Sequence, residues 1–339
     1  MQQYRPYIIL LFYLLPTLVS AQAIDNNAIF RNIPGDRYFR IYYENDFFTG
    51  TDRDYTQGIY IEKVNPYFGK FFLTKLLWRP RNSTLKYGLA VEQDVYTPNH
   101  LDVAGILYGD RPYAGALFLN TFLTATDAHR RQRISSSLST GLIGPDAGGE
   151  GMQKAIHHWI NYITPLGWHN QIRNDLVLNY QLNFEKELFS AGHFLSFSSY
   201  SSIRLGTLSS KATTGFTFMA GNFHSPFKNM GANSAATDHL MPEGYTGGHG
   251  KKWQWYIYDQ PLINLVGYDA TLQGGLFNHS SPYAIPASQI NRLTFQHKFG
   301  IVLLLKKLYL EYYQTGLTEE FSTSVYHRTG GIQIGFGFW

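Results

Sequence analysis

The chain has 339 residues, a formal net charge of +4, 15% charged residues, 16% aromatic residues and no cysteine. The lack of cysteine excludes disulfide bonds and thiolate chemistry, and the small net charge does not suggest a nucleic-acid partner. After the first 21 residues no stretch holds 18 consecutive apolar residues, so the sequence predicts no transmembrane helix there.

The first 21 residues have the pattern of an export signal. Arg5 precedes an apolar run from Ile8 to Val19, and small residues follow up to Ala21. The run is too short to cross a bilayer comfortably as a helix. We therefore expect residues 1–21 to be a signal peptide and residues 22–339 to fold as one domain, with a retained N-terminal anchor as the alternative.

Alternating segments recur from Arg37 to the end of the chain, as in "RYFRIYYEND", "RISSSLSTGLIG" and "HFLSFSSYSSIRLG". Counted in this way there are about twelve strands, each about 9 to 14 residues long, the length that a tilted membrane-crossing strand needs. In several strands one alternate set is aromatic or aliphatic and the other is polar. The pattern predicts an all-β fold, a transmembrane antiparallel β-barrel of about twelve strands, with a soluble β-protein as the alternative.

One segment, residues 148–163, lacks the alternation and predicts a short helix. Its apolar residues recur at helical spacing, and Glu150, Gln153 and His157 are expected on one face. Two interpretations remain open for that face: a solvated surface, or the inward side of a helix lying across a barrel mouth. The apolar residues are Met152, Ile156, Trp159, Ile160 and Ile163.

The stretch "YYENDFFTGTDRDYTQGIYIEK", residues 42–63, is the most polar part of the chain. Asn45, Asp46, Asp52 and Asp54 offer the oxygen ligands that calcium prefers, although their spacing does not match an EF-hand loop. The alternative is a hairpin tip built from turn-forming residues. Because neighbouring strand residues point to opposite faces, we expect one of Asn45 and Asp46 to face the lumen, with Thr56 at the start of the next strand.

His157 is the simplest candidate for a general base. The chain has no Gly-x-Ser-x-Gly elbow, no cysteine nucleophile and no phosphate-binding glycine loop. Two zinc ligands at His157 and His158 are not expected, because adjacent helical residues diverge by about 100°. A hydrolase with this sequence would most simply use a water molecule activated by His157.

Five blocks of sequence, taken together, resemble the family of outer-membrane lipid A 3-O-deacylases. They are "ENDFFTGTDRDYTQG", "EQDVYTPN", "GDRPYAG", "GLIGPDAGGEGMQKAIHH" and "GWHNQIRND", in this order, and the likeness covers about residues 37–339. The resemblance implies a twelve-stranded barrel in the bacterial outer membrane. It also implies calcium-dependent hydrolysis of the ester that joins an acyloxyacyl chain to the glucosamine backbone of lipid A.

The resemblance implies roles for particular residues. The essential Asn-Asp pair of the family falls on Asn45 and Asp46, its threonine on Thr56, and its catalytic histidine on His157. A glutamate that follows the histidine by six residues is Ile163 here, and Glu150 is a candidate substitute. Residues 99–108 also lack the lysine or arginine expected to stabilise the oxyanion.

These residues suggest a working hypothesis for the chemistry. His157 activates water and Ca²⁺ held by Asp46 and Asn45 stabilises the oxyanion, with Asp52 and Asp54 as further candidate ligands. Gln153, Glu150 and Arg111 are expected to support the site; Arg111 either pairs structurally with Asp110 or contacts a substrate phosphate, and the structural role is favoured.

The expected partners are lipid A, or lipopolysaccharide, and outer-membrane lipids, and we expect a monomer. Two other functions stay open at this point. One is a passive outer-membrane pore or transport barrel, because the fold alone does not decide function. The other is a soluble secreted domain that binds glycans or lipids.

Overall fold

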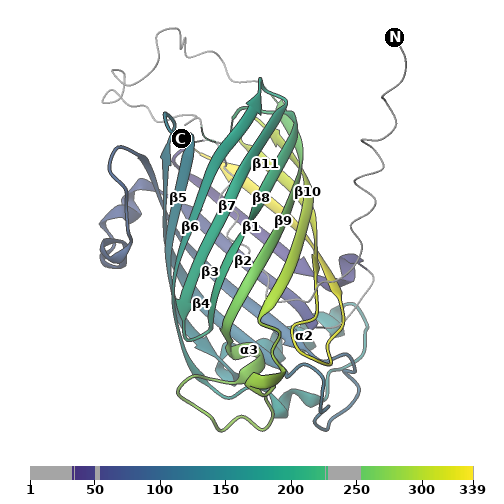
Figure 1. The fold of residues 1–339 in the computed structure, drawn as a ribbon. Helices are drawn as coiled ribbons and strands as arrows, with labels where there is room; N and C mark the ends of the chain where they lie inside the picture. Colours follow the sequence, from purple (N-terminus) through teal and green to yellow (C-terminus); the bar gives the residue numbers. More distant parts are fainter. Residues whose placement is uncertain (1–32, 34, 50–53, 226, 228–252, 339) are drawn as a thin grey trace, which may run out of the picture.

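The computed structural model describes residues 33, 35–49, 54–225, 227 and 253–338, and their twelve strands form one closed antiparallel barrel (Figure 1). Each strand pairs with its neighbours in the sequence, and β1 closes the barrel against β12. The predicted fold class is confirmed. The strands are β1 (Tyr38–Asn45), β2 (Asp54–Val64), β3 (Thr84–Thr97), β4 (Ala114–Asp127), β5 (Gln132–Ile143), β6 (Asp175–Ala191), β7 (Leu195–Gly206), β8 (Ser209–Asn222), β9 (Trp253–Asp269), β10 (Leu293–Leu305), β11 (Leu308–Leu317) and β12 (His327–Gly337).

Helices are short and lie in the connections between strands. The strand β9 stops at Asp269, whose Oδ1 accepts a hydrogen bond from the Thr271 N–H at 2.9 Å and so caps a short helix. No helix in the described part of the chain is long and apolar enough to cross a membrane. The α-helices are α2 (Gly149–Trp159) and α3 (Ala270–Gln273), and the 3-10 helices are η1 (Asp46–Thr49), η2 (Pro66–Lys70), η3 (Phe72–Leu76), η4 (Pro145–Ala147), η5 (Gly167–Asn170) and η7 (Ala287–Gln289).

The barrel interior is polar and filled with side chains. Arg40 donates to both carboxylate oxygens of Glu62 at 2.9 Å, and Arg133 pairs with Glu185 at 3.3 Å. All four of these side chains are buried. Inside a barrel such charges are tolerated because each has a partner and hydrogen bonds.

The outer wall is apolar, as the alternation predicts. The outward residues of β1, β9 and β12 include Ile41, Ile257 and Ile334, each about half exposed, while their sequence neighbours face inward and are buried. A polar interior and an apolar exterior are the arrangement of a barrel that stands in lipid.

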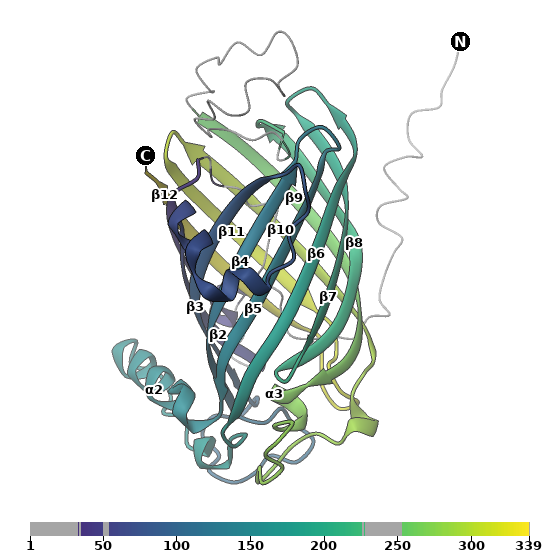
Figure 2. The same cartoon turned by 90° about the vertical axis from the view of Figure 1, so that its left-hand side faces the viewer.

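The two ends of the barrel differ in their connections. At the end where β12 stops, the connections 128–131, 192–194 and 306–307 are short, and the connections 65–83 and 223–252 are longer (Figure 2). At the other end, residues 98–113, 144–174 and 270–292 form long loops that carry α2 and α3. Because outer-membrane barrels have short periplasmic turns and long extracellular loops, α2 lies at the extracellular end. The expected signal peptide, residues 1–21, lies outside the described residues.

Candidate active site

The first part of the site is the end of β1. The Asn45 side chain donates from Nδ2 to the Tyr43 hydroxyl at 2.8 Å, and its Oδ1 accepts from the Phe47 N–H at 2.7 Å. Asn45 thus lies on the outer face with Tyr43 and caps η1, and Asp46 is the first residue of η1 and is buried. The strand ends at Asn45, which lies on the outer face, so the expectation of one lumenal side chain stays a prediction for Asp46. Glu44 is the inward residue there.

A β-bulge in β2 places Thr56. Tyr55 pairs with Tyr96 and Gln57 pairs with Val95, so Thr56 is the extra residue between them. The Thr56 hydroxyl lies 2.5 Å from the hydroxyl of Thr97 on β3. Asn45 and Gln57 are direct partners between β1 and β2. These residues form a polar patch on the outer wall, near its extracellular end.

The helix α2 is seated on the same wall through two glycines. A Cβ atom added to Gly115 of β4 would lie 3.2 Å from the Cα and N of Gly149, the first residue of α2. The Gln93 Nε2 on β3 donates to the Ala147 carbonyl just before the helix, at 2.5 Å. The close approach of backbone to backbone therefore depends on glycine at both positions.

We expect Gly115→Val to displace α2 and to lower catalysis by about 10²-fold, since small misplacements of catalytic groups have effects of this size. The barrel itself should remain folded, which its heat-modifiable mobility on gels would report. The matched control is Gly151→Val, because nothing lies within 4 Å of a carbon added at Gly151. Equal activity in the two variants would contradict this account of how the helix is held.

The side of α2 that meets the wall is polar. Gly149, Gln153 and His157, spaced four residues apart, are buried, and the Trp168 Nε1–H donates to Gln153 Oε1 at 2.7 Å. The apolar residues face away from the wall: Trp159 is 85% exposed and Ile160 52%. Both interpretations of the helix offered by the sequence are therefore incorrect in detail, because α2 turns its polar side to the outer wall and not to solvent or to the barrel mouth.

Glu150 does not join the buried face. The face is centred on Gly149, Gln153 and His157, and Glu150 lies at its edge, where its carboxylate pairs with Lys154 at 2.5 Å. Both of these side chains are about two-fifths exposed. The expected grouping of Glu150 with Gln153 and His157 is thus not observed.

His157 is held by the chain that follows its own helix. Its Nδ1 lies 2.6 Å from the backbone carbonyl oxygen of Ile163, and its ring meets that of Tyr162 edge to face at 5.2 Å. A carbonyl oxygen can only accept a hydrogen bond, so this contact requires the proton on Nδ1. The Nε2 atom then carries the lone pair that a general base needs.

Two buried amides present one polar atom each to the space between wall and helix. Gln93 donates from Nε2 to the Ala147 carbonyl, and its buried Oε1 has no hydrogen-bond partner among the described residues. Gln153 accepts at Oε1 from the Trp168 indole, and its buried Nε2 has no partner in the same described part of the chain. Each orientation is fixed, because a carbonyl only accepts and an indole only donates. An unpaired buried amide atom is costly, so both indicate a polar ligand or ordered water.

Arg111 lies elsewhere. Its guanidinium forms an ion pair with Glu320, donates to the Thr271 hydroxyl at 2.9 Å and stacks over Tyr96, with 4.4 Å to the ring centroid. Asp110 accepts from the Arg111 backbone N–H at 2.7 Å. The contacts of Arg111 with Glu320 and Thr271 join the extracellular loops to one another.

The donor atoms around Asn45 suit a hard cation. Asn45, Asp46 and Thr56 bring amide, carboxylate and hydroxyl oxygens to adjoining strand ends, and calcium prefers oxygen ligands of these kinds. In the described residues no three His, Asp or Glu side chains gather closely enough to hold a metal ion. Asp52 and the side chain of Asp54 lie outside the described part, so the two further candidate ligands stay predictions.

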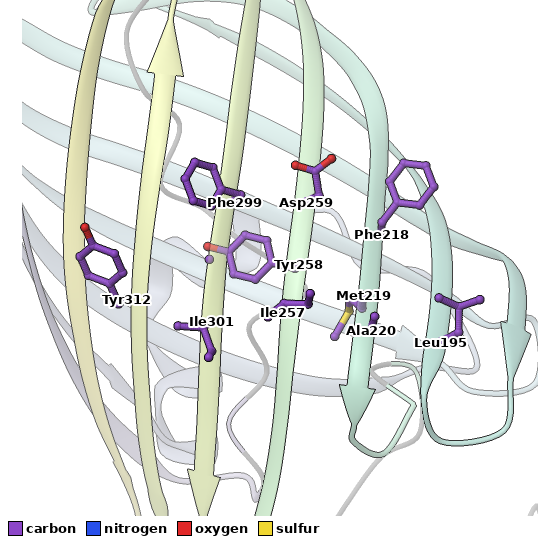
Figure 3. A pocket seen from close by; sticks show the side chains of 11 residues that line it. Leu195, Phe218, Met219, Ala220, Ile257, Tyr258, Asp259, Phe299, Ile301 and Tyr312 are labelled. Carbon is purple, nitrogen blue, oxygen red and sulfur yellow. The ribbon is translucent and has the colours of Figure 1, made fainter. Parts of the chain in front are cut away.

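A separate groove of about 410 Å³ lies on the outer wall across β8 to β11 (Figure 3). It is lined by apolar side chains such as Phe218, Ile257 and Phe299, with Asp259 among them. Leu195 and Ala220, at the ends of β7 and β8, place it toward the periplasmic end. The groove is thus remote from α2 and contributes nothing to the candidate site.

Comparison with known proteins places the chain in a family. The family described as "Outer membrane protein LpxR" matches residues 8–338. The chain belongs to the LpxR family. Its barrel is accordingly an outer-membrane barrel, as the sequence predicts. No curated protein sequence matches the chain.

One solved structure shows the same fold. LpxR from Salmonella typhimurium aligns with a TM-score of 0.69 and 19% identity, over 89% of this chain and 100% of that chain. The β domain of the Bordetella autotransporter BrkA aligns with a TM-score of 0.41 and 8% identity, over 90% of this chain and 99% of that one. The match to LpxR agrees with the resemblance found in the sequence.

Sequence reasoning missed three contributors to the site: Gln57, Gln93 and Gly115. Each belongs to the outward set of its strand, where a lipid-facing wall would carry apolar side chains. A polar residue or glycine in that set was the available signal. Such a residue indicates a site only when α2 is known to lie on this part of the wall.

Proposed function

We propose that the chain is an outer-membrane esterase that removes an ester-linked acyl chain from the glucosamine backbone of lipid A. The observation that carries the proposal is the hydrogen bond from His157 Nδ1 to the Ile163 carbonyl, which leaves Nε2 of the neutral ring as a base on the buried face of α2. The site opens on the lipid-facing wall, where the acyl chains of a membrane lipid lie. Membership of the LpxR family and the likeness to LpxR from Salmonella support the assignment.

The reaction would proceed by direct attack of water. His157 Nε2 takes a proton from a water molecule, whose oxygen attacks the ester carbonyl carbon. The bond from that carbon to the sugar oxygen then breaks, and the sugar oxygen takes the proton back from the imidazolium. The products are the acyloxyacyl chain as a free carboxylic acid and a sugar hydroxyl, so the atoms balance.

A calcium ion bound by Asn45, Asp46 and Thr56 would supply positive charge for the carbonyl oxygen as it becomes an oxyanion. The Ile163 carbonyl takes the orienting role at the position where the family has a glutamate, so the isoleucine side chain is no obstacle. Gln153 Nε2 can donate to a carbonyl of the substrate, and Gln93 Oε1 can accept from a hydroxyl or amide N–H.

We expect Gln93→Leu to raise KM by about tenfold with a smaller effect on kcat, because the lost hydrogen bond positions substrate and takes no part in proton transfer. Steady-state kinetics on purified protein in detergent would measure both constants. Gln171→Leu is a matched control, since Gln171 is also a buried amide with one unpaired atom but follows η5 instead of lying beneath α2. An unchanged KM in Gln93→Leu would remove Gln93 from the substrate site.

A passive pore is disfavoured by the filled interior, in which buried ion pairs such as Arg40–Glu62 and Arg133–Glu185 occupy the space that water would need. The direct test is release of fatty acid from purified lipid A by the detergent-solubilised protein. Conductance across planar bilayers without any fatty-acid release would support the pore and overturn the esterase.

A further inference from the structure

The connection between β2 and β3 folds back over the outer wall of the barrel. Residues 65–78, here called the strap, contain η2 and η3 and lie across β3 to β5 in Figure 2, drawn in dark blue. The strap is a periplasmic connection, but it covers part of the wall on the same side as α2. No role in the proposed reaction requires it.

The strap is firmly attached. The Trp78 N–H donates to the Tyr180 hydroxyl on β6 at 2.8 Å, and the Ser136 hydroxyl on β5 donates to the Trp78 carbonyl at 2.8 Å. Leu77 is buried against Leu123 of β4 and Leu138 of β5. These contacts place the end of the strap partway along the lipid-facing wall, on three strands at once.

The burial of the outward residues of β4 shows which parts of the outer wall are covered. Gly115 is buried under α2, Leu123 is buried against Leu77 of the strap, and Thr121, the outward residue before Leu123, is buried too. Leu117 and Leu119, between these two zones, remain partly exposed. The strand rises about 20 Å between Gly115 and Thr121.

The uncovered strip continues onto the neighbouring strands. Val91 of β3 pairs with Leu119 and is 48% exposed, and on β5 Thr140 pairs with Leu119 and Leu142 with Leu117. We call Val91, Leu117, Leu119, Thr140 and Leu142 the bay. It is almost entirely apolar, begins beside Gln93 and α2, and ends at the strap.

We propose that the bay holds the acyl chain whose ester is placed at His157, and that the strap stops the chain and so sets the longest acyl group the site accepts. This inference rests on the proposed function. The occupant is an extended acyl chain because the bay is apolar, faces lipid, and is continuous with the polar patch under α2. The rise of about 20 Å along β4 from Gly115, under α2, to Thr121 is the distance over which an acyl chain that starts at α2 would extend toward the strap.

The first test compares esters of lipid A that differ only in acyl length: lauroyl, myristoyl and palmitoyl. The wild-type protein should show a sharp upper limit, with kcat/KM about tenfold or more lower once the chain is too long. Replacing Pro66–Leu77 by a short Gly/Ser linker should remove that limit. A limit that persists in an active, strap-free protein would overturn the role of the strap.

A second variant tests the bay with the strap still in place, so that the test does not depend on folding of the strap-free protein. Val91→Trp fills the bay, and it should shift the preferred ester to a shorter chain. Ile301→Trp is the matched control, because Ile301 lies half exposed on the outer wall of β10, away from the bay. An identical chain-length profile in both tryptophan variants would overturn the bay as the acyl site.

A binding measurement separates this inference from the proposed function. The chain has no cysteine, so Leu119→Cys introduces a single thiol in the bay, and Ile301→Cys gives the control. A non-hydrolysable ether analogue of the lipid should slow maleimide labelling of the thiol in Leu119→Cys and leave Ile301→Cys unchanged. Protection without any hydrolysis of ester substrates would keep the bay and refute the esterase; hydrolysis without protection would keep the esterase and refute the bay.

Discussion

Replacing His157 by alanine should lower ester hydrolysis by about 10²- to 10⁴-fold, the range in which a general base contributes to catalysis. The imidazole is 5% exposed and lies on the buried face of α2 with Gln153, where its Nε2 is the base that the proposed reaction uses. The loss should appear mainly in kcat, because proton transfer occurs in the transition state and not in substrate binding. Steady-state hydrolysis of purified lipid A would measure it.

Two control variants sharpen this prediction. His158→Ala removes the adjacent, exposed imidazole and should leave the rate nearly unchanged. Ile163→Ala should also retain activity, because the contact with His157 comes from the backbone carbonyl and not from the side chain. Full activity in His157→Ala would refute the base, and a large loss in Ile163→Ala would refute the account of how the histidine is oriented.

Removal of calcium should abolish hydrolysis, and Asp46→Asn should lower the rate by about 10²- to 10³-fold at a fixed calcium concentration, the scale of losing one oxyanion-stabilising group. Asp46 is buried at the start of η1 and contributes the carboxylate among the described oxygen donors at this place. Excess calcium should restore part of the activity of Asp46→Asn, because the amide keeps one oxygen ligand but loses the charge.

The measurement is a calcium titration of hydrolysis after treatment with a chelator. Asp146→Asn is the control, since Asp146 is an exposed acid of η4 near the start of α2. Hydrolysis that continues at full rate in chelator would contradict a calcium site. So would equal calcium dependence of the wild type and Asp46→Asn.

The sequence predicted the barrel well because alternation reports directly on which side chains face lipid. Twelve strands and the helix around His157 follow from period two and period 3.6 alone. The extent of β9 was less predictable, since the cap at Asp269 ends the strand within a run that still alternates.

The side of the wall on which the site lies was not predictable in this way. Polar residues normally point inward, so Asn45 and Asp46 were expected to offer one lumenal side chain. The end of β1 at Asn45 and the bulge at Thr56 instead place these residues on the outer wall, on which α2 also lies. Both features depend on hydrogen bonds between distant segments, which a single sequence does not display.

The role of Gln93 in the candidate site was not predictable from the sequence either. In the sequence Gln93 is one polar residue in an alternating strand, and its position in the alternation places it on the lipid-facing side. Its meaning depends on the Ala147 carbonyl, 54 residues away, which fixes its amide and leaves Oε1 directed at the site. The position of the strap likewise depends on contacts with Tyr180 and Ser136, which the sequence of residues 65–78 does not predict.

The central claim is that His157 catalyses removal of an ester-linked acyl chain from lipid A at the outer wall of the barrel. Mass spectrometry of lipid A from cells that express the wild-type protein or His157→Ala tests it most directly. The wild type should convert lipid A to a species lighter by one acyloxyacyl group, and His157→Ala should leave lipid A intact although the barrel is inserted and folded. Unmodified lipid A in both strains, or the lighter species in both, would contradict the claim.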